Sequence, residues 1–366
     1  MKHEKTLKLQ NRNELETCGR MNRNDYMVLV NCMTFNQSKY ILDALNGFVM
    51  QKTNFPFVCL VMDDASTDGE QEVIRGFLNQ ECAMESAEFS EIEEANIVVV
   101  PYTTNPNCTM AVYFLKKNLF RTGKKTPLFA PWRERCKYEA ICEGDDYWID
   151  SEKLQKQVDF LESNDNFSMC CSEAVVLSPE GEQDWRRYES SRQVPPKDMI
   201  IGGGLFVQTA SLLFRESLFK GYPAYCINCH VGDYPLKLWG AINGGLYYFS
   251  EKMVVYRFAT RGSWTSNVSE RSVESLLPCW KSEVLMLDGL NKYSNGVYSY
   301  SFNRRIREYI WDNLFSHKAE WRTISLYFHD WIRFFPRRHR VVDFLFRFRL
   351  GRLYLLSKKI IPSLLP

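Results

Sequence analysis

The chain has 366 residues, of which 45% are hydrophobic and 25% are charged. This composition excludes a disordered chain and predicts a large folded domain with an appended region, or several domains. The formal charge of +2 is unevenly distributed. Residues 318–366 contain eleven Lys or Arg against three Asp or Glu, an excess of +8 that leaves −6 for the rest. Only the C-terminal end is therefore basic.

The twelve cysteines show no paired zinc-binding spacing. One CxxC motif, Cys226 to Cys229, has no second pair at a suitable distance. We therefore expect reduced thiols in a cytosolic protein, with a metal or redox role for this motif as the alternative. The N-terminus is polar, and no run reaches about 18 apolar residues. We expect neither a secretion signal nor a membrane-spanning helix.

The first part of the chain alternates between apolar runs and helical patterns. Residues 1–24 are polar and are predicted to form a loose arm. Strands are predicted at Met27–Val30 and Phe57–Met62, and helices at Ser38–Gln51 and Asp68–Leu78.

The alternation continues beyond an acidic segment. Glu81–Glu94 carries six glutamates and is predicted to be a solvated excursion. Further strands are predicted at Ile97–Val100 and Tyr138–Cys142, and helices at Ala111–Leu119 and Lys153–Leu161. Asp150 or Ser151 is expected to cap the last of these helices. Alternating strands and helices predict an α/β fold with a doubly wound, mostly parallel sheet.

Two acidic clusters each follow a predicted strand directly. One is Asp63-Asp64-Ala65-Ser66-Thr67-Asp68, and the other is Glu143-Gly144-Asp145-Asp146. Crowded carboxylates repel one another, so they need a cation or a ligand rich in hydrogen-bond donors. Ligands of open α/β sheets bind at the carboxyl ends of the strands, where both clusters would meet in one cleft. The pattern predicts a metal-assisted site for a nucleotide-linked substrate.

Three motifs occur in order between about Asp25 and Trp264: Thr34-Phe35-Asn36, the turn Asp63–Gly69, and Glu143-Gly144-Asp145-Asp146-Tyr147-Trp148. Together they resemble the family 2 glycosyltransferases of the GT-A fold, particularly bacterial members that build surface polysaccharides. The resemblance implies a Rossmann-like, mostly parallel sheet flanked by helices. It also implies inverting transfer of a sugar from a nucleotide-diphosphate (NDP) sugar to an acceptor hydroxyl, in lipopolysaccharide, capsule or exopolysaccharide synthesis.

A sugar transferase must stabilise a departing nucleoside diphosphate, and a divalent cation that bridges the phosphates does so. Mn²⁺ or Mg²⁺ typically takes one or two protein carboxylates and leaves other positions to phosphate oxygens and water. Asp145 is the candidate metal ligand, and Glu143 and Asp146 are candidates for binding the nucleotide sugar. Glu143 stands where the family's Asp-x-Asp motif has its first Asp, which favours a role at ribose or at a metal-bound water. Capping of the following helix is the alternative for this turn.

The resemblance places Asp64 at the nucleotide base, where its carboxylate would accept a hydrogen bond from a ring N–H. The same pocket is expected to be bordered by Thr34, Phe35 and Asn36. An ordinary polar turn is the alternative for these three residues. Asp63 is expected to pair with Ser66 in the turn, and Asp68 to cap the next helix.

The acceptor half resembles the family from Gly202–Arg215 onward, where a flexible loop leads into a strand. The family places a general base ahead of the next helix, and Asp233 holds that position here. A carboxylate at a helix start is held rigidly enough to deprotonate an acceptor hydroxyl. Capping of the helix Tyr234–Ile242 is the alternative role, and one residue can do both. His230 is a second candidate base.

Tyr256-Arg257-Phe258, followed by Gly262-Ser263-Trp264, resembles the segment that closes over the diphosphate. Family members often have a His shortly after the Tyr-Arg pair, whereas this chain continues to Arg261 without one. Arg257 or Arg261 is therefore expected to clamp phosphate, since guanidinium binds such oxygens bidentately. A surface ion pair is the alternative for Arg257.

The C-terminal region loses the family pattern. Helical spacing of apolar residues at Ser272–Leu287 and Phe302–Trp331 predicts a C-terminal helical appendage. The expected domains are a polar arm at 1–24, a GT-A domain at 25–265 with a nucleotide half at 25–150 and an acceptor half at 151–265, and a helical, basic-aromatic region at 266–366.

From Trp331 to Ile361, aromatic and cationic residues interleave. We expect this tail to bind an anionic membrane surface, which would make the protein peripheral on the inner face of the cell membrane. A core-packing helix is the alternative. Interleaved Arg and Phe also bind nucleic acid, but no recognition fold accompanies them, so no nucleic-acid partner is expected. The expected partners are an NDP-sugar donor and a saccharide or lipid-linked saccharide acceptor.

Two other functions stay open at the level of sequence. The first is a nucleotidyltransferase, which shares the nucleotide-binding fold and the metal-binding carboxylates. A Gly-rich phosphate loop with a Lys near the first strand would favour this class, but Thr34-Phe35-Asn36-Gln37 lacks both features. The non-enzymatic alternative is an inactive assembly protein at the membrane surface. Intact Asp145 and Asp233 argue against it.

Overall fold

The computed structural model of the protein describes residues 25–120, 122, 125–258, 272–316, 327–334 and 340. The chain divides into two compact units. The sheet unit comprises Met1–Val194, Val207–Gly221 and Asn243–Ser263, and the helical unit comprises Pro195–Phe206, Tyr222–Ile242 and Trp264–Pro366. Two segments from within 25–265 therefore group with the C-terminal helices.

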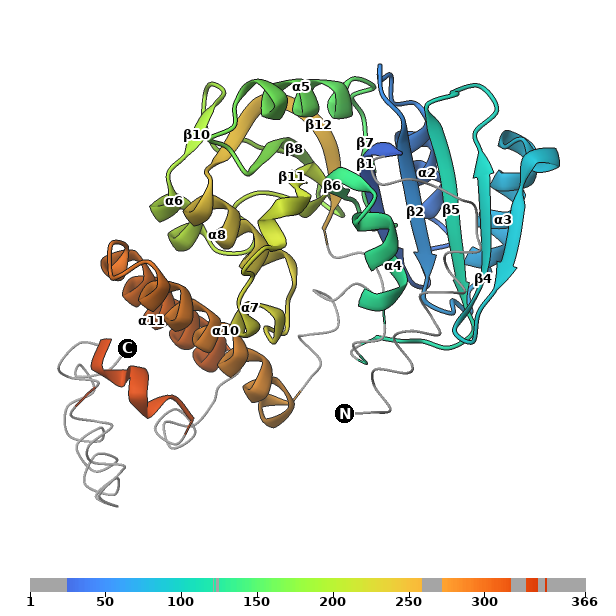
Figure 1. Cartoon of the computed structure of the whole chain (residues 1–366). Coiled ribbons are helices and arrows are strands. Elements are labelled where there is room, and N and C mark those ends of the chain that lie inside the picture. The colour runs from blue at the N-terminus through green and yellow to red at the C-terminus, as the bar shows by residue number, and fades with distance from the viewer. Residues whose placement is uncertain are drawn as a thin grey trace. The chain divides into compact units, whose positions relative to one another are not determined.

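The sheet unit is built on one mixed sheet (Figure 1). Its strands in the described residues are β1 Tyr26–Thr34, β2 Phe57–Asp63, β3 Glu88–Glu91, β4 Ala95–Pro101, β5 Cys108–Leu115, β6 Cys136–Ile141, β7 Tyr147–Trp148, β8 Met169–Ser178, β9 Gly181–Trp185, β10 Arg192–Val194, β11 Leu213–Arg215 and β12 Leu246–Arg257. The order is β10-β12-β8-β11-β6-β1-β2-β5-β4-β3, while β7 pairs with β12 and β9 with β8. At the centre, β6, β1, β2 and β5 are parallel neighbours. The α/β architecture expected from the sequence is confirmed.

Helices cover both faces of the central strands. Those around the sheet are α2 Ile41–Val49, α3 Glu70–Glu81, α4 Thr126–Arg133 and α5 Lys153–Ser163. Val28 of β1 belongs to a core cluster with residues of α2, α3 and α5, whereas the next residue, Leu29, belongs to a second cluster with residues of α4. Successive strand residues point to opposite faces, so a doubly covered strand is a continuous apolar run. Phe57–Met62 has this character, and its prediction as a buried strand is confirmed.

One predicted helix is wrong. Ala111–Leu119 does not form a helix, because β5 ends at Leu115 and lies between β2 and β4. Every residue from Met110 to Leu115 is buried. A run made only of apolar residues fits helical spacing as well as strand spacing, so the pattern could not distinguish the two. The acidic segment Glu81–Glu94 also contains regular structure, since β3 pairs with β4 at the sheet edge. Charged residues suit an edge strand because they oppose pairing with other chains.

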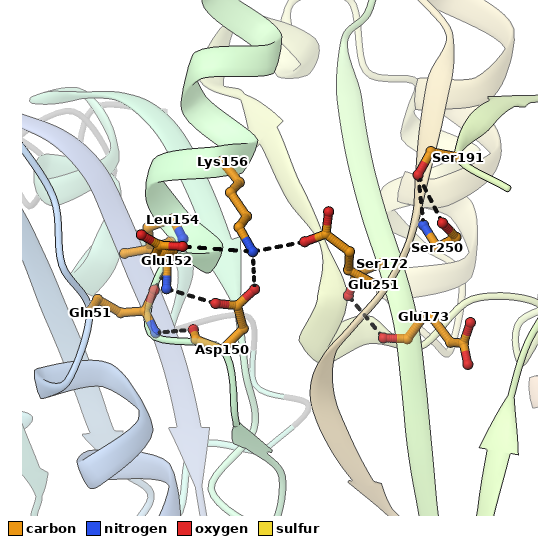
Figure 2. Close-up of polar contacts among 10 residues, drawn as sticks. All are labelled: Gln51, Asp150, Glu152, Leu154, Lys156, Ser172, Glu173, Ser191, Ser250 and Glu251. Carbon is orange, nitrogen blue, oxygen red and sulfur yellow. Dashed lines mark hydrogen bonds and ion pairs between the residues drawn. The ribbon is translucent and has the colours of Figure 1, made fainter.

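Polar contacts fix the start of α5 (Figure 2). Lys156 Nζ lies 2.8 Å from a carboxylate oxygen of Asp150 and 2.8 Å from one of Glu251 on β12. Asp150 also accepts a hydrogen bond from the amide of Glu152 at 2.8 Å. Glu152 itself holds the N-cap position. The prediction of Asp150 or Ser151 as the cap is therefore wrong, because Asp150 binds an amide that precedes the helix.

The helical unit contains short helices from the middle of the chain and two long C-terminal ones. Its described helices are α6 Pro196–Gly202, α7 Ala224–Ile227, α8 Asp233–Asn243, α10 Val273–Tyr293, α11 Ser299–Ser316 and the 3-10 helix η4 His329–Phe334. The last residue of α8, Asn243, belongs to the sheet unit. Ser272 caps α10 by accepting the amide of Ser275. The predicted helical appendage is confirmed. None of the helices in the described ranges has the length and apolar character needed to cross a membrane.

Candidate active site

The carboxyl ends of β2, β1 and β6 lie next to one another because these strands are parallel neighbours. Thr34 at the end of β1 is opposite Asp63 at the end of β2. Beyond β6, the amide of Gly144 donates a hydrogen bond to the carbonyl of Met33 on β1, at 3.2 Å. The two acidic clusters therefore reach the same edge of the sheet.

The acidic turn, residues 143–146, packs closely against the end of β1. A Cβ atom on Gly144 would lie 2.2 Å from Thr34 Oγ1 and 2.5 Å from Gln37 Oε1. Such distances are far below van der Waals contact, so only glycine allows this approach. The amide of Asp146 closes the turn by donating to the carbonyl of Glu143 at 3.1 Å.

Arg257 at the end of β12 anchors the acidic turn. Its amide donates to Asp146 Oδ1 at 2.9 Å, and its Nη1 donates to the carbonyl of Asp145 at 2.7 Å. Its Nη2 pairs with Asp43 of α2, and its guanidinium lies over the ring of Tyr147 at 4.4 Å. The Arg257 side chain is only 10% exposed. This packing gives Arg257 a structural role, and its contact with phosphate stays a prediction.

Three carboxylates crowd within the acidic turn, those of Glu143, Asp145 and Asp146. Burial raises the pKa of Asp146 well above its usual range, and the charges of Asp145 and Glu143 raise it further against the opposing effect of Arg257. Asp145 is 8% exposed, whereas Glu143 is exposed. A cation near Asp145 would relieve this repulsion, so the donor set fits a divalent metal.

The described ranges contain no group of three or more His, Cys, Asp or Glu side chains placed to bind a metal ion together. In nucleotide sites Mg²⁺ and Mn²⁺ typically take one or two protein carboxylates, and phosphate oxygens and water complete the coordination.

Glu70, which the sequence did not single out, joins the loops that follow β1 and β2. Its buried carboxylate accepts hydrogen bonds from the hydroxyl of Thr34, from the amide of Gln37 at 2.9 Å and from Ser66 Oγ at 2.8 Å. Burial raises the pKa of Glu70, and these hydrogen bonds oppose the rise. The sequence does show a carboxylate at the start of the predicted helix. Such a residue usually stabilises its own helix by interacting with the helix dipole, so it did not indicate a link between two loops.

The loop after β1 contains a residue in the left-handed backbone conformation. Asn36 has a φ of +56°, a value that Asn adopts more readily than most residues other than glycine. Its amide donates to Ser66 Oγ at 2.9 Å, and its Oδ1 accepts the amide of Thr67 at 2.8 Å. Phe35 beside it is 45% exposed. The expected pocket residues therefore form a fixed loop that leaves one aromatic ring open to solvent.

Asp64 is buried and bound by the protein through both carboxylate oxygens. Oδ1 accepts the amide of Leu119 at 2.6 Å, and Oδ2 lies 2.6 Å from Lys125 Nζ. A ring N–H of a nucleotide base would share these oxygens with the protein donors. Lys125, close to the predicted base pocket, was not identified from the sequence.

The remaining aspartates of the acidic cluster after β2 organise its turn. Asp63 Oδ1 accepts the amide of Ser66 at 3.2 Å, so the predicted pairing is confirmed. Asp63 Oδ2 is buried and has no hydrogen-bond partner within the described residues. Asp68 accepts the amide of Glu70 at 3.1 Å and that of Ser38 at 2.9 Å. The helix N-cap is nevertheless Gly69, so the capping prediction for Asp68 is wrong by one residue.

Asp233 belongs to the helical unit, where it is the first residue of α8. Its Oδ2 lies 2.7 Å from Nζ of Lys237, one helical turn later. Lys237 is 1% exposed and also donates to the carbonyl of Gly204 at 2.9 Å. Lys237 thereby fixes the position of the Asp233 carboxylate at the start of α8, and a general base requires such a fixed position.

Both ring nitrogens of His230 face side chains of α10. Its Nδ1 lies 3.2 Å from Ser282 Oγ, and its Nε2 lies 3.8 Å from Glu283 Oε2. This arrangement favours a structural role over that of the second candidate base. The CxxC residues Cys226 and Cys229 are thiols whose pKa burial raises to about 12 and about 11, the opposite of a reactive pair. Arg261 and the segment 262–264 lie outside the described residues.

Sequence comparison finds distant relatives. No family model matches the chain. The uncharacterized proteins Rv1520 of Mycobacterium tuberculosis (strain ATCC 25618 / H37Rv) and Mb1547 of Mycobacterium bovis are each 29% identical to it over 246 residues, or 65% of this chain and 61% of theirs. The chain thus spans about 61% of the length of the curated relatives it matches.

Structure comparison finds TarS of Staphylococcus aureus. The structure of its residues 1–349 with UDP has a TM-score of 0.58 and 15% identity, over 90% of this chain and 89% of that one. The corresponding structure with UDP-GlcNAc has a TM-score of 0.54, again with 15% identity. At this identity the likeness concerns the fold alone, and it agrees with the expected GT-A-like architecture.

Proposed function

We propose that the chain is a glycosyltransferase that moves a sugar from an NDP-sugar to an acceptor hydroxyl with inversion. One observation carries the proposal: three parallel strands bring Thr34, Asp64 and the acidic turn to one edge of a GT-A-like sheet. Nucleotides bind at this edge in open α/β folds. TarS, whose fold is similar, binds UDP and UDP-GlcNAc in its solved structures, so UDP-sugars are the first donors to test.

The proposed roles follow from the chemistry of each residue. Thr34, Phe35, Asn36 and Asp64 border the nucleoside, and Glu143, Asp146 and Arg257 support the sugar diphosphate. Asp145 would hold Mn²⁺ or Mg²⁺, which when bound neutralises charge on the leaving diphosphate. Asp233 accepts the proton of the acceptor hydroxyl, whose oxygen forms the new glycosidic bond as the bond to the diphosphate breaks. The buried Asp63 Oδ2, which has no hydrogen-bond partner among the residues that the structure describes, supports a donor ligand nearby.

We further propose the family 2 assignment and a role in cell-surface polysaccharide synthesis, with a saccharide or lipid-linked saccharide as acceptor. The basic, aromatic tail after Trp331 would hold the protein on an anionic membrane surface. A peripheral position on the inner face of the cell membrane would confine it to the plane of a lipid-linked acceptor.

Product identity tests the reaction class. The purified protein is incubated with Mn²⁺ and, in separate reactions, with a panel of NDP-sugars or with nucleoside triphosphates plus sugar 1-phosphates, and the released phosphates are separated. A glycosyltransferase releases the nucleoside diphosphate from its NDP-sugar donor, slowly with water as acceptor. A nucleotidyltransferase instead joins a sugar 1-phosphate to the nucleotidyl group of a nucleoside triphosphate and releases pyrophosphate. Turnover of no panel member would contradict the proposal, and pyrophosphate release would replace it.

A further inference from the structure

His230 ties the segment that carries Asp233 to α10. The backbone amide of His230 donates to Ser282 Oγ at 3.0 Å, and the ring Nδ1 lies 3.2 Å from the same oxygen. The ring Nε2 faces Glu283, the next residue of α10, at 3.8 Å. Two consecutive residues of a C-terminal helix therefore hold one histidine, three positions before Asp233.

Glu283 is a buried carboxylate that α11 also contacts. Arg305 Nη2 lies 4.0 Å from Glu283 Oε1, and Tyr309 shares a hydrogen bond with the carboxylate. Burial raises the pKa of Glu283 to about 7, the charge of Asp233 adds to the rise, and Arg305 and Tyr309 oppose it. The charges of Glu283 and Asp233 therefore interact.

The other side of Asp233 is bound to the glycine segment 202–204. Lys237 bridges Asp233 Oδ2 at 2.7 Å and the Gly204 carbonyl at 2.9 Å. Arg305 packs against Gly203, where an added Cβ would lie 2.6 Å from Nη2. Arg305 thus contacts both the glycine segment and Glu283, and it connects the two sides of the network around Asp233.

We propose that Glu283 and Arg305 are positioning residues for the base Asp233, so that the two C-terminal helices set its orientation. The inference rests on the proposed function, in which Asp233 deprotonates the acceptor. Helices α10 and α11 would thus contribute to catalysis through Glu283 and Arg305, neither of which is required to touch the substrate.

The same network makes turnover sensitive to pH. Within the described residues, the charged and titratable groups around Glu283 include Cys229, His230, Asp233, Tyr234, Arg305 and Tyr309. Ionised Glu283 attracts the guanidinium of Arg305, which packs against Gly203, whereas protonated Glu283 loses this attraction. Turnover should therefore rise as the pH increases through the titration of Glu283.

The test compares wild type with Glu283→Gln and with Glu274→Gln, an exposed glutamate on the same helix. Release of UDP from UDP-GlcNAc is measured between about pH 5 and about pH 9, and UDP affinity is measured by calorimetry. We expect Glu283→Gln to lower kcat at least about 10-fold with UDP affinity nearly unchanged. It should also lose the inflection near pH 7 that Glu274→Gln retains.

Hydrogen exchange gives a second readout that does not need activity. In Glu283→Gln and in Ser282→Ala, amides of residues 228–236 should exchange faster than in wild type, while those of the central sheet keep their rates. Unchanged exchange, or a kcat and pH profile like those of wild type, would overturn the positioning role. If wild type turns over no sugar nucleotide, the proposed function fails, and exchange alone decides whether α10 holds the segment.

Discussion

At the scale of single residues, close packing and buried charge organise the candidate site more than exposed functional groups do. Gly144 lets the acidic turn lie against Thr34, and Glu70 binds the loops after β1 and β2 together. Neither role is visible in sequence, because each depends on residues far apart in the chain. Asp145 and Asp64 could be singled out, since carboxylates directly after apolar strands form a local pattern.

The Gly144 contact leads to a stability prediction. Gly144→Ala should destabilise the protein by about 1–3 kcal/mol and weaken UDP binding, because the added methyl group forces the acidic turn away from β1. Gly76→Ala is the matched control. This glycine lies within α3 with nothing within 4 Å of the added Cβ, so alanine should preserve or raise stability. Thermal unfolding with and without UDP measures both effects. An unchanged melting temperature for Gly144→Ala would refute the close contact.

At the scale of elements, the sequence predicted strands well where an apolar run has polar or turn-forming residues on both sides. The buried strand Phe57–Met62 is flanked by Pro56 and Asp63, and it occurs within one residue of its prediction. The helix predicted at Ala111–Leu119 is wrong because an uninterrupted apolar run has no hydrophobic periodicity that could distinguish a helix from a strand. Strand β3 was missed because its edge position, which favours charge, follows only from pairing with β4.

At the scale of the whole molecule, the units interleave along the chain. Asp233 and the glycine segment 202–204 group with the C-terminal helices, while the acidic turn belongs to the sheet unit. A division at one point of the sequence could not anticipate this, because grouping depends on contacts such as those of His230 with α10. The proposed metal ligand Asp145 and the proposed base Asp233 thus belong to different units.

The tail makes a separate prediction about location. Trp331 is buried in the helical unit, so a truncation should retain it and delete only 335–366. The full chain should bind anionic vesicles at low salt and detach as salt rises, since each basic residue contributes about 1 kcal/mol near the surface. The truncated protein should stay in solution and still release UDP from its donor. Equal vesicle binding by both proteins would contradict membrane attachment through the tail.

The most direct test of the central claim, that the acidic turn holds the donor diphosphate through a cation, is donor affinity with and without Mn²⁺. Calorimetry would measure UDP-GlcNAc binding to wild type, to Asp145→Asn and to the control Asp150→Asn, whose carboxylate pairs with Lys156. We expect Mn²⁺ to tighten binding about 10-fold or more in wild type and in the control, and not in Asp145→Asn. The same Mn²⁺ dependence in Asp145→Asn as in wild type would contradict the account.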